Sequence, residues 1–196
     1  MSNFITQTMI DTLISNKTRI KLLLKFFLNS NTTSYLRGLE SEFGDSTNAI
    51  RLELNRLESA GMLSSHSSGN KKIFQANQEH PLFTELQSII RKHIGLDKIT
   101  STVIERLGNV QRVYLTGSFA QGRDSQIIDL LLVGEIDINY LVTLISKAEK
   151  LVNRKIRYLI YSEEQEKGIH WDGIAGGPLL IWESATENEH VSEDPK

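Results

Sequence analysis

Residues 117–134 read GSFAQGRDSQIIDLLLVG, and this stretch decides the fold of the second half of the chain. It follows the apolar run Val113-Tyr114-Leu115 and begins with a glycine–serine pair. Its end, IIDLLLV, is an apolar run with one carboxylate, Asp129, which is a composition typical of a strand buried in a sheet. The stretch therefore predicts a strand, a tight turn, a short helix and a second strand that carries Asp129.

Outside this stretch, helical and strand patterns alternate along the rest of the second half. We expect helices over residues 98–107 and 138–152, and strands over residues 110–116, 127–133, 155–161 and 179–182. Helices interleaved with strands indicate an α/β domain built on one sheet. Residues 184–196 (SATENEHVSEDPK) are polar and acidic and offer nothing to bury, so we expect a disordered tail there.

The first half of the chain has a different order, in which three helices precede a hairpin. Apolar residues at helical spacing, with cap residues between them, predict helices over residues 17–29, 35–43 and 47–60. The third helix carries Ile50, Leu54 and Leu57 on one face. Two short strands, at residues 62–66 and 71–76, flank a polar tip at residues 67–70 and predict the hairpin.

A fourth amphipathic helix is expected over residues 82–94, and Gly95 ends it. Its apolar side packs either within one domain or against a second copy of the chain, and the sequence leaves both arrangements open. We expect a domain over residues 1–80, a linker helix over residues 81–98 and a second domain over residues 99–183, so that the fold is α/β overall with two domains.

Composition and charge exclude several classes of protein. The chain has 196 residues, 39% of them hydrophobic and 23% charged, and no cysteine, which excludes disulfides and thiolate metal sites. Its first residues resemble no signal peptide and no apolar run approaches membrane-spanning length, so we expect a soluble cytoplasmic protein. Residues 1–98 hold 12 Lys+Arg against 9 Asp+Glu, a net charge of +3. Residues 99–196 hold 10 against 15, a net charge of −5, which supports two domains with different partners.

The segment STNAIRLELNRLESAGML, residues 46–63, resembles the recognition-helix region of bacterial winged helix-turn-helix regulators of the arsenical-repressor or multiple-antibiotic-resistance type. Gly69 and Phe74 follow at the spacing of that family's hairpin, and the resemblance covers about residues 16–78. The resemblance implies a DNA-binding domain whose third helix enters the major groove.

Polar residues on the third helix and the hairpin tip are candidates for the contacts with DNA. Arg and Asn side chains read base edges, whereas Lys at a hairpin tip suits phosphate. The alternative is an ordinary solvated helix face and a polar turn, and Glu53, near the same face, is expected to repel phosphate. The candidate DNA-binding residues are Thr47, Asn48, Arg51, Asn55, Asn70, Lys71 and Lys72.

The stretch that begins at Gly117 resembles the minimal branch of the polymerase-beta-like nucleotidyltransferases. Their frame is GSxAxG followed by a strand with two carboxylates one residue apart, which, with a third from a neighbouring strand, bind two metal ions. This chain aligns Asp129 with the second carboxylate, but it has Ile127 at the first and Arg157 at the position that fits the third. The resemblance therefore implies a degenerate domain, with Asp129 as a remnant, no catalytic residue and no metal site.

The same frame implies a nucleotide site at Gly117, Ser118, Asp129 and Arg157, where glycine admits phosphate oxygens and the serine and backbone amides bind them. Arg157 either pairs with Asp129 or binds a phosphate directly. The alternative is a tight strand-to-helix turn with a serine cap, together with a structural ion pair.

Taken together, the residues and the two resemblances predict a transcriptional regulator that binds double-stranded DNA as a homodimer. Its C-terminal domain senses a nucleotide or mediates contacts. Two other functions stay open: an active nucleotidyltransferase that requires Mg²⁺, and a protein–protein module, such as an antitoxin-like neutraliser, that uses residues 82–94 as its contact surface.

Overall fold

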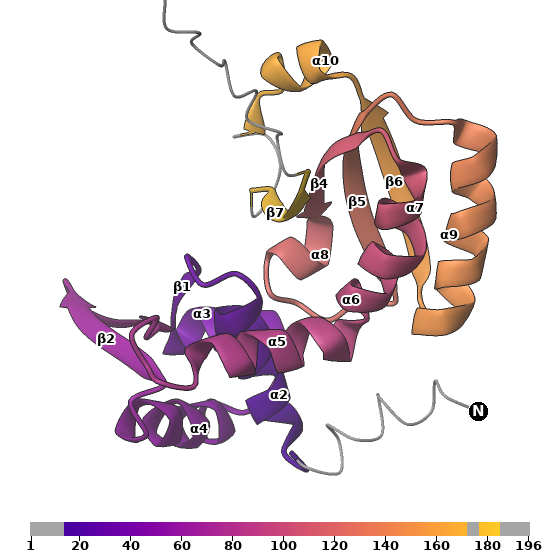
Figure 1. The fold of residues 1–196 in the computed structure, drawn as a ribbon. Coiled ribbons are helices and arrows are strands. Elements are labelled where there is room, and N and C mark those ends of the chain that lie inside the picture. The colour runs from indigo at the N-terminus through magenta and orange to yellow at the C-terminus, as the bar shows by residue number, and fades with distance from the viewer. Residues whose placement is uncertain (1–13, 172–176, 185–196) are drawn as a thin grey trace, which may run out of the picture.

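Two β-sheets, each with its own set of helices, organise the chain (Figure 1). The computed structural model describes residues 14–171 and 177–184. The N-terminal half, residues 14–95, contains a three-stranded antiparallel sheet with helices, and the C-terminal half, residues 96–184, contains a four-stranded mixed sheet. The predicted α/β fold class is therefore confirmed.

The N-terminal half begins with α2, whose first turn is capped by the Asn16 side chain accepting the backbone N–H of Arg19 at 3.1 Å. The helix continues into the π-helical turn η1, where Phe26 and Phe27 are fully buried. The first helix predicted from the sequence is thus present, with a change of helical type near its middle. The elements of this half are α2 (Lys17–Leu23), η1 (Leu24–Leu28), β1 (Thr33–Tyr35), α3 (Leu36–Phe43), α4 (Thr47–Ser59), β2 (Leu63–Ser68), β3 (Lys71–Ala76) and α5 (Phe83–Ile94).

The predicted hairpin is confirmed as β2 and β3, which pair from Leu63↔Ala76 to Ser68↔Lys71 and leave a two-residue turn. The short strand β1 was not expected, because its residues read as a polar break between helices. It pairs antiparallel with the other edge of β3, which gives the order β1-β3-β2.

Helix α5 packs on the N-terminal half rather than spanning open space. The Phe83 ring lies 5.8 Å from that of Phe27 in η1, and Ile90 and Ile94 are buried. Packing within the molecule therefore occupies one side of the helix. Leu82, which precedes it, and Ile89 remain about half exposed.

The C-terminal half covers one face of its sheet with helices (Figure 1). The strand order is β6-β5-β4-β7, with β4 antiparallel to β5 and β7, and β5 parallel to β6. Ile128, Leu130 and Leu132 of β5 are buried in the core. The elements are α6 (Leu96–Ile99), η2 (Thr100–Ile104), α7 (Glu105–Leu107), β4 (Val110–Thr116), α8 (Gly117–Ala120), β5 (Ile127–Gly134), α9 (Ile138–Val152), β6 (Lys155–Tyr161), α10 (Glu163–Lys167) and β7 (Leu179–Glu183).

The two halves share one continuous hydrophobic core, and polar bonds join them. Lys25 Nζ and Asn29 Nδ2 donate to backbone carbonyls of Gln121 and Ala120. The predicted division into separate domains stays a prediction. Of the predicted tail, Ser184 is described and bonds to Gln111, whereas residues 185–196 lie outside the described residues. None of the helices that the structure describes has the length and apolar content needed to cross a membrane.

Candidate functional site

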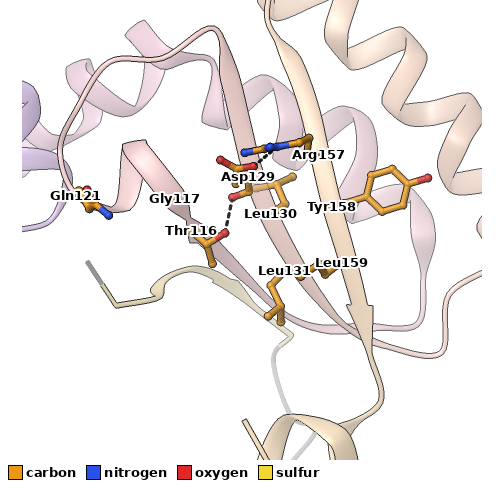
Figure 2. A pocket seen from close by; sticks show the side chains of 9 residues that line it. All are labelled: Thr116, Gly117, Gln121, Asp129, Leu130, Leu131, Arg157, Tyr158 and Leu159. Carbon is orange, nitrogen blue, oxygen red and sulfur yellow. Dashed lines mark hydrogen bonds and ion pairs between the residues drawn. The ribbon is translucent and has the colours of Figure 1, made fainter. Parts of the chain in front are cut away.

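The first candidate site lies on the sheet face opposite the one that carries Ile128, Leu130 and Leu132 of β5. Thr116, Asp129 and Arg157 occupy directly opposed positions on β4, β5 and β6, so their side chains form one row across the sheet. Arg157 Nε donates to Asp129 Oδ1 at 2.6 Å (Figure 2). This hydrogen bond raises the pKa of Arg157. The ion pair that the sequence left as one of two alternatives is therefore present.

Gly117 is required by the position of the Asp129 carboxylate. Its φ angle is +65°, a conformation that L side chains rarely adopt. A Cβ at this position would also lie 2.3 Å from Asp129 Oδ2. The glycine thus makes room for the protein's own carboxylate, which explains its presence without reference to a bound phosphate.

A pocket of about 700 Å³ surrounds this ion pair, and we call it the sheet pocket. Its lining residues are Thr116, Gly117, Gln121, Asp129, Leu130, Leu131, Arg157, Tyr158 and Leu159 (Figure 2). Three of the four predicted nucleotide-binding residues are among them. Ser118, in the one-turn helix α8, is not among them. Gln121 was missed, since nothing in its sequence context marks it.

The side chains in the sheet pocket do not fit the two divalent metal ions of the nucleotidyltransferase mechanism. Among the residues that the structure describes, Asp129 is the one carboxylate that lines it, and its Oδ1 already accepts from Arg157. Asp124, in the preceding loop, pairs with Arg154 Nη1 at 2.8 Å. Within the described residues, no group of three or more His, Cys, Asp or Glu side chains could hold a metal ion. We therefore derive no chemical step through bound metal.

The second candidate site is a groove of about 460 Å³ between α4 and the hairpin, which we call the basic groove. It is lined by Tyr35, Leu36, Arg37, Arg51, Leu54, Asn55, Asn70, Lys71, Lys72 and Phe74. Five of the seven predicted DNA-binding residues are in this set. The other two, Thr47 and Asn48, lie at the start of α4 outside the lining, and Asn48 Oδ1 accepts from Arg51 Nη1 at 3.2 Å.

Three cations of the basic groove remain available to an anionic partner. Arg37, Arg51 and Lys71 are exposed, and none of them forms an ion pair with the residues that the structure describes. Lys71 Nζ lies 4.2 Å from the centroid of the Tyr35 ring, which holds the ammonium at the groove wall. Lys72, by contrast, pairs with Glu58 at 2.7 Å.

Arg37 is the cation of the basic groove that sequence reasoning missed. It belongs to α3 and lies far in the sequence from both the third helix and the hairpin. Arg37 lies at the exposed start of α3, which directly follows strand β1, and this position places it in the lining of the groove. Only the three-dimensional packing of α3 against α4 reveals this placement.

The expectation that Glu53 would repel phosphate is wrong. Glu53 is fully buried on the inner side of α4, where it accepts from Arg19 Nε and Arg56 Nη1, each at 2.6 Å. Burial acts to raise the pKa of Glu53, but the hydrogen bonds from the two arginines outweigh it and lower the pKa. The carboxylate is thus neutralised in the interior and does not face the groove.

A third polar cluster lies on the same face of the C-terminal sheet as the sheet pocket, further along β4. Glu166 of α10 accepts from Arg112 Nε at 2.9 Å and from the Tyr114 hydroxyl at 2.6 Å. The hydrogen bond from Arg112 is the main cause of the lowered pKa of Glu166. Burial, with the hydrogen bond to Glu166, raises the pKa of Tyr114 to about 12. These groups satisfy one another and fasten α10 to β4.

No protein-family model matches the chain, and no curated protein matches it. Solved structures of two proteins from Sulfolobus solfataricus resemble parts of it. A proposed nucleotidyltransferase is 20% identical over 45% of this chain and 77% of its own, with a TM-score of 0.32. The transcriptional regulator BldR is 15% identical over 52% of this chain and 73% of its own, with a TM-score of 0.35. At these identities and scores, neither similarity carries an inference about function.

Proposed function

We propose that the protein is a transcriptional regulator that binds double-stranded DNA through the basic groove. One observation carries the proposal: residues predicted independently on α4 and on the hairpin line a single groove, and Arg37 adds a further cation to it. Burial of Glu53 removes the one carboxylate that was expected to oppose DNA on this face.

The chemistry of the groove suits the two kinds of contact that a duplex offers. Arg51 and Asn55 are exposed on α4, and such side chains can form bidentate hydrogen bonds with base edges in the major groove. Lys71 lies at the hairpin tip, where its ammonium suits a backbone phosphate. Helix α4 would thus read the bases, and the hairpin would position the protein on the phosphate backbone.

The test is a fluorescence-anisotropy titration with duplexes selected by the protein from a random library, at several salt concentrations. Arg51→Ala should weaken binding by about 1–3 kcal/mol and relax the base preference at one position. Lys71→Ala should weaken binding to all sequences alike and reduce the salt slope by about one. Arg106→Ala and Lys147→Ala, at exposed positions of the other half, serve as controls. Failure to select any duplex, or equal affinities for all variants, would refute the proposal.

We further infer that the regulator binds as a homodimer, because a two-fold symmetric protein reads a palindromic operator with two half-sites. Light scattering of the free protein and of its complex measures the stoichiometry. One chain per duplex in the complex would contradict the inference.

We propose a nucleotide as the ligand of the sheet pocket, bound by Arg157 and not processed. A phosphate would compete with Asp129 for the guanidinium, because Asp129 already accepts from Arg157 Nε. Asp129→Asn should therefore release Arg157 and strengthen nucleotide binding, whereas Arg157→Ala should weaken it. Calorimetry with ATP, GTP, CTP and UTP, with and without Mg²⁺, measures both effects.

The alternative function, metal-dependent nucleotidyl transfer, predicts a different effect of the same Asp129→Asn variant. An enzyme that relies on Asp129 as a metal ligand would lose activity in Asp129→Asn. Transfer of label from a nucleotide to an acceptor, present in the native chain and absent from this variant, would establish the alternative and overturn our assignment.

A further inference from the structure

Lys25 of the π-helical turn η1 joins the two halves of the molecule. Its side chain is about nine-tenths buried, and its Nζ donates to both carboxylate oxygens of Glu42 at 2.9 Å and to the backbone carbonyl of Gln121 at 2.8 Å. An ammonium group has three donors, so these three acceptors satisfy it completely. Any displacement of the Gln121 carbonyl would leave a buried donor without a partner.

Close packing reinforces this bond. Gly122, with a φ angle of +71°, lies so near η1 that a Cβ there would be 2.4 Å from Lys25 Cα. Asn29, one turn further along, donates from Nδ2 to the Ala120 carbonyl at 3.2 Å. Gly122 therefore lies directly against the backbone of η1, and the hydrogen bonds from Lys25 and Asn29 hold residues 120 and 121 beside it.

One end of the Lys25 bridge lines the sheet pocket, and the other lies in a helix that contributes to the basic groove. Gln121 lines the sheet pocket (Figure 2), and its backbone carbonyl accepts from Lys25 Nζ. Glu42 lies in the last turn of α3, which packs against α4 and contributes Arg37 to the basic groove. A π-helical turn within a helix often marks a functional position, and here it supplies the bridging residue.

We propose that the Lys25 bridge couples the sheet pocket to the basic groove, so that a ligand in the pocket changes the affinity of the protein for DNA. The proposal rests on the function proposed above and adds a route between its two sites. A ligand that shifts Gln121 moves an acceptor of the buried ammonium, and Lys25 and Glu42 then transmit the change to α3. By thermodynamic linkage, DNA must change the affinity for the pocket ligand by the same factor.

The experiment measures DNA affinity of the full chain with and without a saturating nucleotide. The native chain should show at least about a fivefold change. Lys25→Met, which removes the ammonium and keeps a long apolar side chain, should bind DNA and nucleotide separately but show a change of less than about twofold. Lys21→Met is the matched control, because Lys21 bonds to Phe43 and Asp45 at the end of the same α3 helix. It should keep the native coupling.

The possible failures are separable. If circular dichroism shows that Lys25→Met is unfolded, the near-isosteric variant Glu42→Gln serves instead. Glu42→Gln should reduce the coupling while Lys25 still bonds to Gln121. Absence of DNA binding or of nucleotide binding in the native chain refutes the proposed function. Native coupling below twofold with both ligands bound, or full coupling in Lys25→Met, refutes the bridge alone.

Discussion

The two oxygens of Asp129 have different neighbours, and this division explains the residues around it. Oδ1 accepts from Arg157, and Oδ2 lies where a Cβ of residue 117 would be. Gly117 is therefore constrained twice, by its positive φ angle and by the carboxylate beside it. Gly44 has nearly the same φ angle, +67°, but open space around its Cα, so it isolates the first constraint from the second.

Gly117→Ala should lower the free energy of unfolding by about 2–3 kcal/mol, and Gly44→Ala by about 1 kcal/mol. The difference measures the collision with Asp129. Urea denaturation of both variants checks the prediction, and the double variant Gly117→Ala with Asp129→Ala should recover part of the loss. Equal losses at the two glycines would show that the carboxylate moves aside freely.

Buried carboxylates should make the fold sensitive to acid. The pKa of Glu53 in the folded state lies below its ordinary value of 4.5. A group with a lowered pKa contributes stability above its unfolded pKa and loses that contribution as the pH falls through its folded pKa. Unfolding free energy should thus decline below about pH 4.5. Glu53→Gln should be less stable at pH 7 and should lose less on acidification, whereas Glu105→Gln, at an exposed position, should follow the native curve.

At the scale of elements, periodicity and caps predicted most helices and strands, because each of these elements buries one regular face. The third helix, expected over residues 47–60, is α4 (Thr47–Ser59), and the strand expected over residues 110–116 is β4. The strand β1 was missed because its three residues, Thr-Ser-Tyr, show no period. Its hydrogen bonds to β3, rather than its own side chains, make it a strand.

Residues that line the two pockets were predicted where they fall in a recognised motif or element pattern, and missed where no local signal marks them. Gly117, Asp129 and Arg157 lie in a recognisable frame, whereas Gln121 and Arg37 carry no local signal. The outward position assigned to Glu53 was wrong for a related reason. Periodicity places a residue on a helix face, but it does not reveal that Arg19 of α2, together with Arg56 of α4 itself, will compensate the charge of a buried carboxylate.

The N-cap of α9 gives an element-level prediction. Asp137 Oδ1 accepts the backbone N–H groups of Asn139 and Tyr140, at 2.9 and 3.2 Å. Asp137→Ala leaves both donors to water and should cost about 1 kcal/mol of unfolding free energy. Asp137→Asn also caps well and should be almost neutral. Thermal denaturation of the pair checks this, and equal losses for Ala and Asn would contradict capping as the cause.

At the scale of the whole molecule, the continuous core predicts one cooperative unfolding event despite the two sheets. Both tryptophans, Trp171 and Trp182, belong to the C-terminal half, so their fluorescence reports that half alone. Fluorescence should change at the same urea concentration as hydrogen-exchange protection in η1. Gly122→Ala, which forces a Cβ against Lys25, should lower both midpoints together. Separate midpoints in the native chain would show that the halves unfold independently.

Gly122 has a consequence for how such chains change over generations. Its place against the η1 backbone is a packing requirement, as the place of Gly117 against Asp129 is. Selection for a folded protein alone would therefore retain both glycines, whatever the protein binds. Packing alone can thus preserve a glycine-rich signature, and position 122 should vary among related chains only together with a rearranged contact at position 25.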